Sequence, residues 1–146
     1  MRQRNNKGFS LVELAIGLAV VTILILAISM SSGIRDTARM QAAADSVQSL
    51  RSAAESYLAS GNVSYTGVDI TKLKGQNLLP ANFSGTSTNP WGGNYTVGPN
   101  PSDATKFDIA LTKVSSTDNT KLISFFSNVA NTTAYDSASK TWTVTF

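Results

Sequence analysis

Apolar and polar positions divide the chain into three regions with different periodicities. From Leu14 to Ile34 there are 21 consecutive residues without a charged side chain. The next region has apolar residues at alternating spacings of three and four, which is the spacing of one helix face: Met40, Ala43, Val47, Leu50, Ala54 and Tyr57. Because Gly61 follows these residues, the pattern predicts one helix of about fifty residues from near Ser10 to Ser60.

Beyond Gly61 the pattern changes to short segments separated by residues that favour turns. Gly and Pro punctuate this region, and apolar residues alternate with polar ones in several places, as they do in half-buried strands. We expect a short helix capped by Asp69, strands at 94–97 and 106–114, a helix-like segment at 120–130 and a last strand at Trp142–Phe146. This order predicts an α+β fold in which the long helix lies across a small antiparallel sheet of three or four strands.

Net charge depends on the first residues of the chain. The formal charge is +3, and Arg2, Arg4 and Lys7 account for it, since the other nine basic residues balance nine acidic ones. The remaining Lys and Arg residues are scattered along the chain and form no basic cluster, so we predict no specific nucleic-acid partner. Basic residues favour the cytoplasmic side of a membrane, which would place the leader inside and the residues beyond Ile34 outside.

Two residue types that carry much of enzyme chemistry are missing. The chain has no Cys and no His, which removes disulfides, thiolate ligands, the commonest general base and the commonest transition-metal ligand. No phosphate-binding loop, nucleophile elbow or dinucleotide fingerprint occurs either. We therefore predict a protein that is not an enzyme and that uses no cofactor and no metal.

Three interpretations compete for the apolar N-terminal segment. It is a secretory signal cleaved after Ala27-Ile28-Ser29, an uncleaved membrane anchor, or a segment whose short leader is removed between Gly8 and Phe9. Only the third gives Glu13 a partner, because cleavage creates an α-amino group on Phe9, four residues away. An unpaired buried carboxylate is costly, so in a bundle of such helices Glu13 would pair with the Phe9 amine of a neighbour and fix the axial register.

The stretch Gly8-Phe9-Ser10-Leu11-Val12-Glu13, with its basic leader and long apolar run, resembles the class III signal of type IV pilins and type II secretion pseudopilins. The resemblance implies cleavage by prepilin peptidase between Gly8 and Phe9, N-methylation of Phe9, and Glu13 as the register residue. It also implies a pilin fold whose long helix has a protruding apolar half, divided into a leader at 1–8, a transmembrane or filament-core segment at 9–34, an amphipathic segment at 35–60 and a globular head at 61–146. Many pilins bend this helix at a proline; residues 28–34 contain none, so we expect a more continuous helix, with weak points near Gly17 or Gly33.

A second stretch, Asn89-Pro90-Trp91-Gly92-Gly93, precedes the expected strand at 94–97 and should deliver a large ring into the domain. It is similar to a run in type IVb pilins and, less closely, to one in the major pseudopilin, which holds calcium in an acidic loop. We interpret Asp103, Asp108 and Asp118 as solvated carboxylates and not as metal ligands, because they are single and separated. Type IVb pilins usually carry a disulfide, which this chain cannot form, and burial of Phe125 or Phe126 is expected to replace it.

The function implied by this resemblance is that of a structural subunit of a type IV pilus. Such a subunit sits in the inner membrane with its C-terminal domain outside, and an assembly platform and ATPase polymerise it through its N-terminal helix into a surface filament. The alternatives are a pseudopilin of a type II secretion system and a monomeric, membrane-anchored binding module. What the filament touches, and whether the subunit is major or minor, does not follow from the residues.

Overall fold

The computed structural model describes residues 11–81 and 83–146, and for residues 11–17 and 21–32 it describes the backbone alone. The chain divides into two units between Thr37 and Ala38. We call residues 38–146 the C-terminal unit. Within the described residues, the elements follow in the order α1 (Leu11–Ala59), α2 (Ile70–Gly75), β1 (Tyr95–Pro99), β2 (Phe107–Leu111), α3 (Ser116–Phe126), β3 (Thr132–Asp136) and β4 (Thr141–Thr145).

Helix α1 is α-helical over 49 residues, which confirms the predicted long N-terminal helix. It continues through Gly33, where the hydroxyl of Thr37 donates a hydrogen bond of 3.0 Å to the Gly33 carbonyl. It ends at Ala59, and Gly61 then adopts a positive φ of 100°, a conformation that favours glycine. No helix within the described residues combines the length and the hydropathy of a membrane span.

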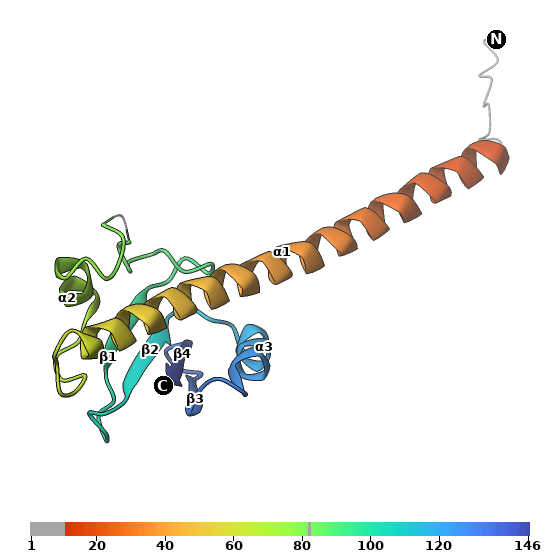
Figure 1. Cartoon of the computed structure of the whole chain (residues 1–146). Coiled ribbons are helices and arrows are strands. Elements are labelled where there is room, and N and C mark those ends of the chain that lie inside the picture. Colours follow the sequence, from red (N-terminus) through yellow and green to blue (C-terminus); the bar gives the residue numbers. More distant parts are fainter. Residues whose placement is uncertain (1–10, 82) are drawn as a thin grey trace, which may run out of the picture. The chain divides into compact units, whose positions relative to one another are not determined.

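The part of α1 in the C-terminal unit is amphipathic, as the spacing predicted. Ala43, Val47, Leu50, Ala54 and Tyr57 are all buried, and Met40 packs at the edge of the same core. The intervening residues are mostly exposed and polar. This face therefore forms one side of the hydrophobic core, and the sheet forms the other (Figure 1).

The four strands form one antiparallel sheet in the order β1-β2-β4-β3. The predicted alternation in β2 is confirmed, because Phe107, Ile109 and Leu111 are buried and Asp108 and Ala110 are not. In β4, Trp142 and Val144 have no exposed surface. The ladder continues past β4, since Phe146 and Phe107 exchange backbone hydrogen bonds of 3.0 and 3.2 Å.

The short helix α2 begins where the sequence predicted. The carboxylate of Asp69 accepts a hydrogen bond of 2.7 Å from the Lys72 amide, so it satisfies one of the free N–H groups of the first turn. Leu73 is the buried residue of this helix. Ile70, the first residue of the helix, is partly buried and packs against the same core, so two side chains hold α2 in place.

Strand β1 is shifted slightly from the predicted 94–97 and β2 is shorter than the predicted 106–114, whereas α3 and β3 differ more from the sequence prediction. Helix α3 begins at Ser116, four residues before the expected start, because Ser115 caps it: its hydroxyl accepts a hydrogen bond from the Asp118 amide at 3.1 Å. Strand β3 was not predicted at all. Its residues alternate only between exposed and half-buried, since it is an edge strand held by pairing with β4 and contributes little to the core.

Candidate functional site

The residues predicted for processing lie at the N-terminus. Gly8 and Phe9 fall outside the described residues. Glu13 lies in the first turn of α1, and its side chain falls outside the described part of the structure. Cleavage, methylation and the pairing of Glu13 with the Phe9 amine therefore remain predictions.

The second predicted site, the turn that precedes β1, is organised by Asn89, the first residue of the stretch, for which the sequence predicted no role of its own. Its side chain is buried, with 4% of the residue exposed, and its carbonyl oxygen accepts the N–H groups of Trp91 at 3.0 Å and Gly93 at 2.8 Å. Its amide donates to the carbonyl oxygen of Thr112 at 2.7 Å. An Asn before a Pro/Gly-rich run is a signal for such a side-chain turn, and this signal could have identified it.

Gly93 lets this turn approach the loop after β2. A Cβ atom at this position would lie 2.1 Å from the carbonyl oxygen of Thr112, which is far inside van der Waals contact. The hydroxyl of Thr112 also accepts the next amide, that of Asn94, at 2.8 Å. Backbone and side-chain bonds thus fix the turn against β2, and no residue larger than glycine fits at position 93.

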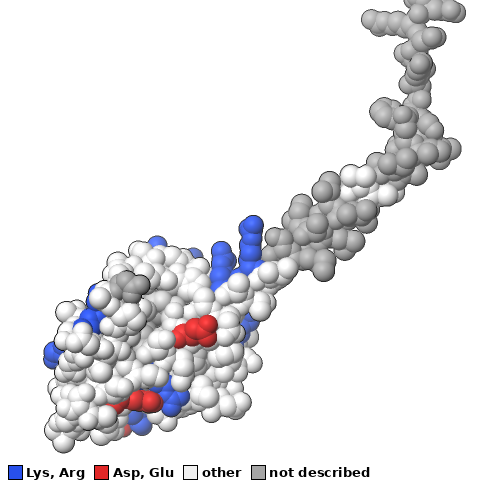
Figure 2. Space-filling view, turned by 45° about the horizontal axis from the view of Figure 1, so that its top comes forward, with Lys and Arg blue, Asp and Glu red and all other residues white. Residues whose placement is uncertain are grey.

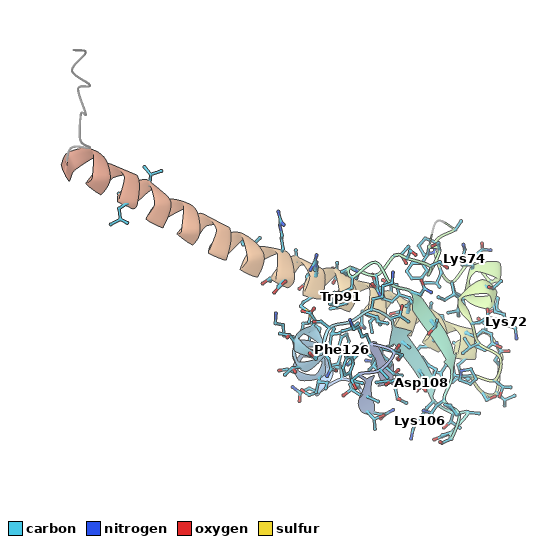
Figure 3. All side chains as sticks on the ribbon, turned by 180° about the vertical axis from the view of Figure 1, so that it is seen from behind. Lys72, Lys74, Trp91, Lys106, Asp108 and Phe126 are labelled. Atoms are coloured by element: carbon cyan, nitrogen blue, oxygen red, sulfur yellow. The ribbon has the colours of Figure 1, made fainter. Side chains whose placement is uncertain are left out.

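Trp91 joins the same turn to α3 (Figure 3). The indole N–H donates a hydrogen bond of 2.8 Å to the Asp118 carboxylate, which also accepts the Ser115 hydroxyl at 2.7 Å and lies 3.9 Å from the Lys121 ammonium. The ring is half-buried at the edge of the core, so the expectation that it enters the domain is met only in part. Its role here is to connect the turn to α3.

The prediction that Asp108 and Asp118 are simply solvated is wrong. Asp108 accepts hydrogen bonds from the Thr145 hydroxyl at 2.7 Å and from the Asn100 amide at 3.0 Å, so it links β2 to β4 and to the loop after β1. Asp118 is the acceptor for Trp91 and Ser115 described above. Among the described residues, the acidic side chains form no group of three or more that could hold a metal ion.

Asp103 lies in a local turn and is partly solvated, with 40% of its side chain exposed. The amide and hydroxyl of Thr105 donate to its carboxylate, and the Lys106 ammonium lies 3.2 Å away. These contacts favour the charged form and lower the pKa of Asp103 below its usual value, with the Thr105 hydroxyl as the largest cause. Side chains of the turn itself therefore hold it together.

Of the two rings expected to replace a disulfide, one is buried and one is not. Phe126 is 2% exposed and lies 5.3 Å from the Trp142 ring, whereas Phe125 is 56% exposed. Helix α3 places neighbouring residues about 100° apart, so only one of two consecutive rings can face the core. Phe126 therefore anchors α3 to β4, and Phe125 remains at the surface.

A cavity lies beside this anchor, between α1 and the end of β4. Arg51 lines it, with its guanidinium 4.7 Å from the centre of the Phe146 ring and 2.8 Å from the Glu55 carboxylate. Tyr65 also lines the cavity, and burial raises the pKa of its phenol, with the charge of Glu55 adding to the increase. The basic and acidic groups in this cavity are already paired, so they offer no free charge to a ligand.

The face of the C-terminal unit shown in Figure 2 carries few charged side chains. Basic and acidic groups appear there as isolated spots on a predominantly uncharged surface. Only 14% of the residues in the whole chain are charged. A surface of this kind suits contacts between proteins better than binding to a polyanion.

Comparison with known protein families gives two matches that together cover most of the chain. Residues 3–29 match the prokaryotic N-terminal methylation motif. Residues 37–145 match the family described as PilS N terminal. The first match contains the predicted cleavage site and Glu13, and the second contains nearly all of the C-terminal unit.

Two curated relatives are each named "Major structural subunit of bundle-forming pilus", one from Escherichia coli O127:H6 and one from Escherichia coli O111:H-. Each is 32% identical to the chain over 126 residues, which cover 78% of the chain and 62% of the relative. The chain thus spans less than two thirds of the length of these relatives. With its methylation motif, long N-terminal helix and four-stranded antiparallel sheet, the chain belongs to the PilS N-terminal family, within the type IV pilin superfamily.

Proposed function

We propose that this protein is the structural subunit of a type IV pilus and has no enzymatic role. The observation that carries the proposal is the N-terminal methylation motif at residues 3–29, joined to a PilS-family C-terminal unit. The two Escherichia coli relatives are named as structural subunits of a pilus, and we extend that role to this chain.

In this proposal the prepilin peptidase cleaves between Gly8 and Phe9 and methylates the new amine. Residues 9–34 then hold the subunit in the inner membrane, with the C-terminal unit outside, until the assembly platform and its ATPase move it into the filament. The support for this anchor is the uncharged run of 21 residues from Leu14 to Ile34, long enough as a helix to match a hydrocarbon core of about 30 Å. In the filament these helices exchange contact with lipid for contact with one another.

The proposed filament also gives Glu13 a role. Its carboxylate interrupts a segment that is otherwise uncharged, and the only nearby cation that processing provides is the Phe9 amine. Pairing between neighbouring subunits would satisfy both charges and set the stagger of one helix against the next. The filament appears at the cell surface after assembly.

The test is the mass of the mature N-terminal peptide, together with electron microscopy of the cell surface. We expect a peptide that begins with methylated Phe9 and filaments that contain this chain. Gly8→Val should block cleavage by placing a branched side chain at the cut, whereas Gly17→Val, in the apolar run, is the matched control and should still be processed. A mature N-terminus at Met30, or an unprocessed chain without filaments, contradicts the proposal.

A further inference from the structure

Two exposed apolar sites lie at separate places on the C-terminal unit. The first, which we call the apolar patch, consists of Phe125 and Val129, which are 56% and 50% exposed. The second is Val63, which is 100% exposed in the loop that follows α1. Figures 1 and 3 show α3 and this loop on different sides of the strands, so the two sites do not belong to one surface.

The apolar patch is a product of how α3 ends. The amides of Val129 and Ala130 donate to the Phe126 carbonyl at 3.1 and 3.0 Å, so the chain turns tightly after the last helical residue. This turn leaves Val129 about one turn beyond Phe125 on the same flank of α3. Ile123, which is also exposed, lies on the other flank, about 160° from Phe125 at 100° per residue, and is not part of the patch.

Aromatic contacts connect the apolar patch to the loop that carries Val63. The Phe125 ring packs on Phe126 at 5.2 Å, Phe126 on Phe146 at 6.5 Å, Phe146 on Phe107 at 5.6 Å and Phe107 on Tyr65 at 4.7 Å. Tyr65 is two residues from Val63, and its amide donates to the Ala104 carbonyl at 2.9 Å. Because packed rings in a core allow little relative movement, α3 and Tyr65 are held at a fixed spacing, and Val63 lies two residues from Tyr65.

The area that these three side chains could bury indicates which kind of partner could bind them. Two half-exposed side chains and one exposed valine would bury on the order of a few hundred Å², well below the roughly 1,200 Å² of a stable interface between free proteins. Such a contact is useful only between molecules that are already held together, where the effective concentration is high. Subunits joined through their N-terminal helices meet this condition.

We propose that Val63 of one copy of this chain docks onto Phe125 and Val129 of a neighbouring copy. This inference rests on the proposed function, because a helical filament needs heterologous contacts in which two different surfaces of the same subunit meet. Residues 56–68 and 122–135 contain no charged residue. The cations nearest the patch have carboxylate partners. Arg51, which donates to the Val129 carbonyl at 3.4 Å, pairs with Glu55. Lys121, one helical turn before Phe125, lies 3.9 Å from Asp118. The contact therefore leaves no charge without a partner. Because the two sites lie at separate places on the C-terminal unit, each subunit can use both at once.

The absence of Cys from the chain makes a direct test possible. We would introduce Val63→Cys and Val129→Cys together into the full chain, isolate filaments from cells and add a mild oxidant. Denaturing gels should then show a ladder of covalent oligomers from the double variant and only monomers from each single variant. Val63→Cys with Ile123→Cys is the matched control, since Ile123 is on the other flank of α3, and it should give no ladder.

The outcomes separate this inference from the proposed function. If the double variant forms filaments but gives no ladder, or if the Ile123 control gives an equal one, the docking contact is wrong and the filament role stands. If the unmodified chain forms no filaments in its own cells, that result contradicts the proposed function itself.

A second test introduces opposite charges at the two sites and measures the yield of filaments. Phe125→Lys and Val63→Glu should each lower filament yield roughly tenfold, the factor that corresponds to a contact free energy of about 1.4 kcal/mol. The combined variant should recover most of the loss, because the new charges can pair across the interface. No recovery, with circular dichroism showing that both variants are folded, contradicts the contact.

Discussion

The indole nitrogen of Trp91 donates a hydrogen bond of 2.8 Å to the carboxylate of Asp118, 27 positions later in the sequence. The bond joins the turn before β1 to the first turn of α3, two segments on which the pattern of apolar residues gave separate predictions. Asp118 is itself oriented by Ser115, the residue that caps α3. One side-chain contact therefore fixes the position of the turn relative to the helix.

Removal of this bond should destabilise the folded protein. Trp91→Phe keeps an aromatic ring but removes the N–H group, and hydrogen bonds to charged groups contribute about 1.5–3 kcal/mol. We expect the free energy of unfolding, measured with urea on the detergent-solubilised full chain, to fall by about that amount. Thr117→Ala, at an exposed position on the same helix turn, should change it by less than about 0.5 kcal/mol. Equal effects of the two variants contradict the structural role of the bond.

Gly93 should tolerate no larger residue. In Gly93→Ala the new Cβ would lie 2.1 Å from the Thr112 carbonyl oxygen, so the turn must move away from β2 and lose the Asn89 bonds. We expect a loss of about 3 kcal/mol or more in the free energy of unfolding. Gly98→Ala in β1 is the control, because nothing lies within 4 Å of its added Cβ, and it should be neutral or slightly stabilising.

The two rings at the end of α3 should behave differently on truncation. Phe126→Ala removes a side chain that is 2% exposed and should cost about 3–5 kcal/mol, as is usual for a buried Phe. Phe125→Ala removes one that is 56% exposed and should cost less than about 1 kcal/mol. Thermal unfolding followed by circular dichroism would distinguish the two, and a larger shift for Phe125 would contradict the assignment of Phe126 as the anchor.

Whether an element could be predicted depends on how far apart in the sequence its interacting residues lie. The apolar stripe from Met40 to Tyr57 and the alternation in β2 report burial directly, so the long helix and the central strand were predicted correctly. Strand β3 was missed because its side chains are at most half-buried, and its conformation depends on pairing with β4. The order of apolar and polar residues within β3 itself does not reveal this pairing.

The same reasoning applies to the turn before β1. Its Pro and Gly residues were visible in the sequence, but the bond from Asn89 to Thr112 spans 23 positions, and that from Trp91 to Asp118 spans 27. Carboxylates such as Asp108 and Asp118 were called solvated because partners on distant elements cannot be recognised from spacing. The structure shows these partners, and the two bonds of the turn connect it to the end of β2 and to α3.

Tyr95 should make stability depend on alkaline pH. Its phenol oxygen is buried without a hydrogen-bond partner among the described residues, and burial raises its pKa above 10.0, partly offset by the nearby Ser46 hydroxyl. The folded state thus holds the phenol proton more tightly than the unfolded state does. This contribution to stability is fully present below pH 10 and is lost as pH rises through the unfolded and then the folded pKa.

Tyr95→Phe removes this titration. We expect the variant to be as stable as the wild type at pH 7, because a buried hydroxyl without a partner stabilises nothing, and to lose less stability between pH 9.5 and 11, a range set by the usual pKa of about 10. Urea unfolding at a series of pH values measures both effects. Tyr135→Phe is the comparison, since the Tyr135 hydroxyl donates to the Val114 carbonyl at 2.9 Å and its loss should lower stability already at pH 7.

Glu13 provides the sharpest test of the proposed filament. Glu13→Ala removes the only acidic side chain before Asp36, so the Phe9 amine of a neighbouring subunit would be buried without a partner. Breaking a buried ion pair from one side costs about 3–5 kcal/mol, and that cost recurs at every subunit of a polymer. We expect surface filaments to disappear in electron micrographs while the processed subunit still accumulates in the membrane fraction. Glu55→Ala, which removes a half-exposed partner of Arg51, should leave filaments intact, because exposed pairs of this kind contribute at most about 1 kcal/mol. Normal filaments from Glu13→Ala would show that the axial register is set by contacts other than this carboxylate.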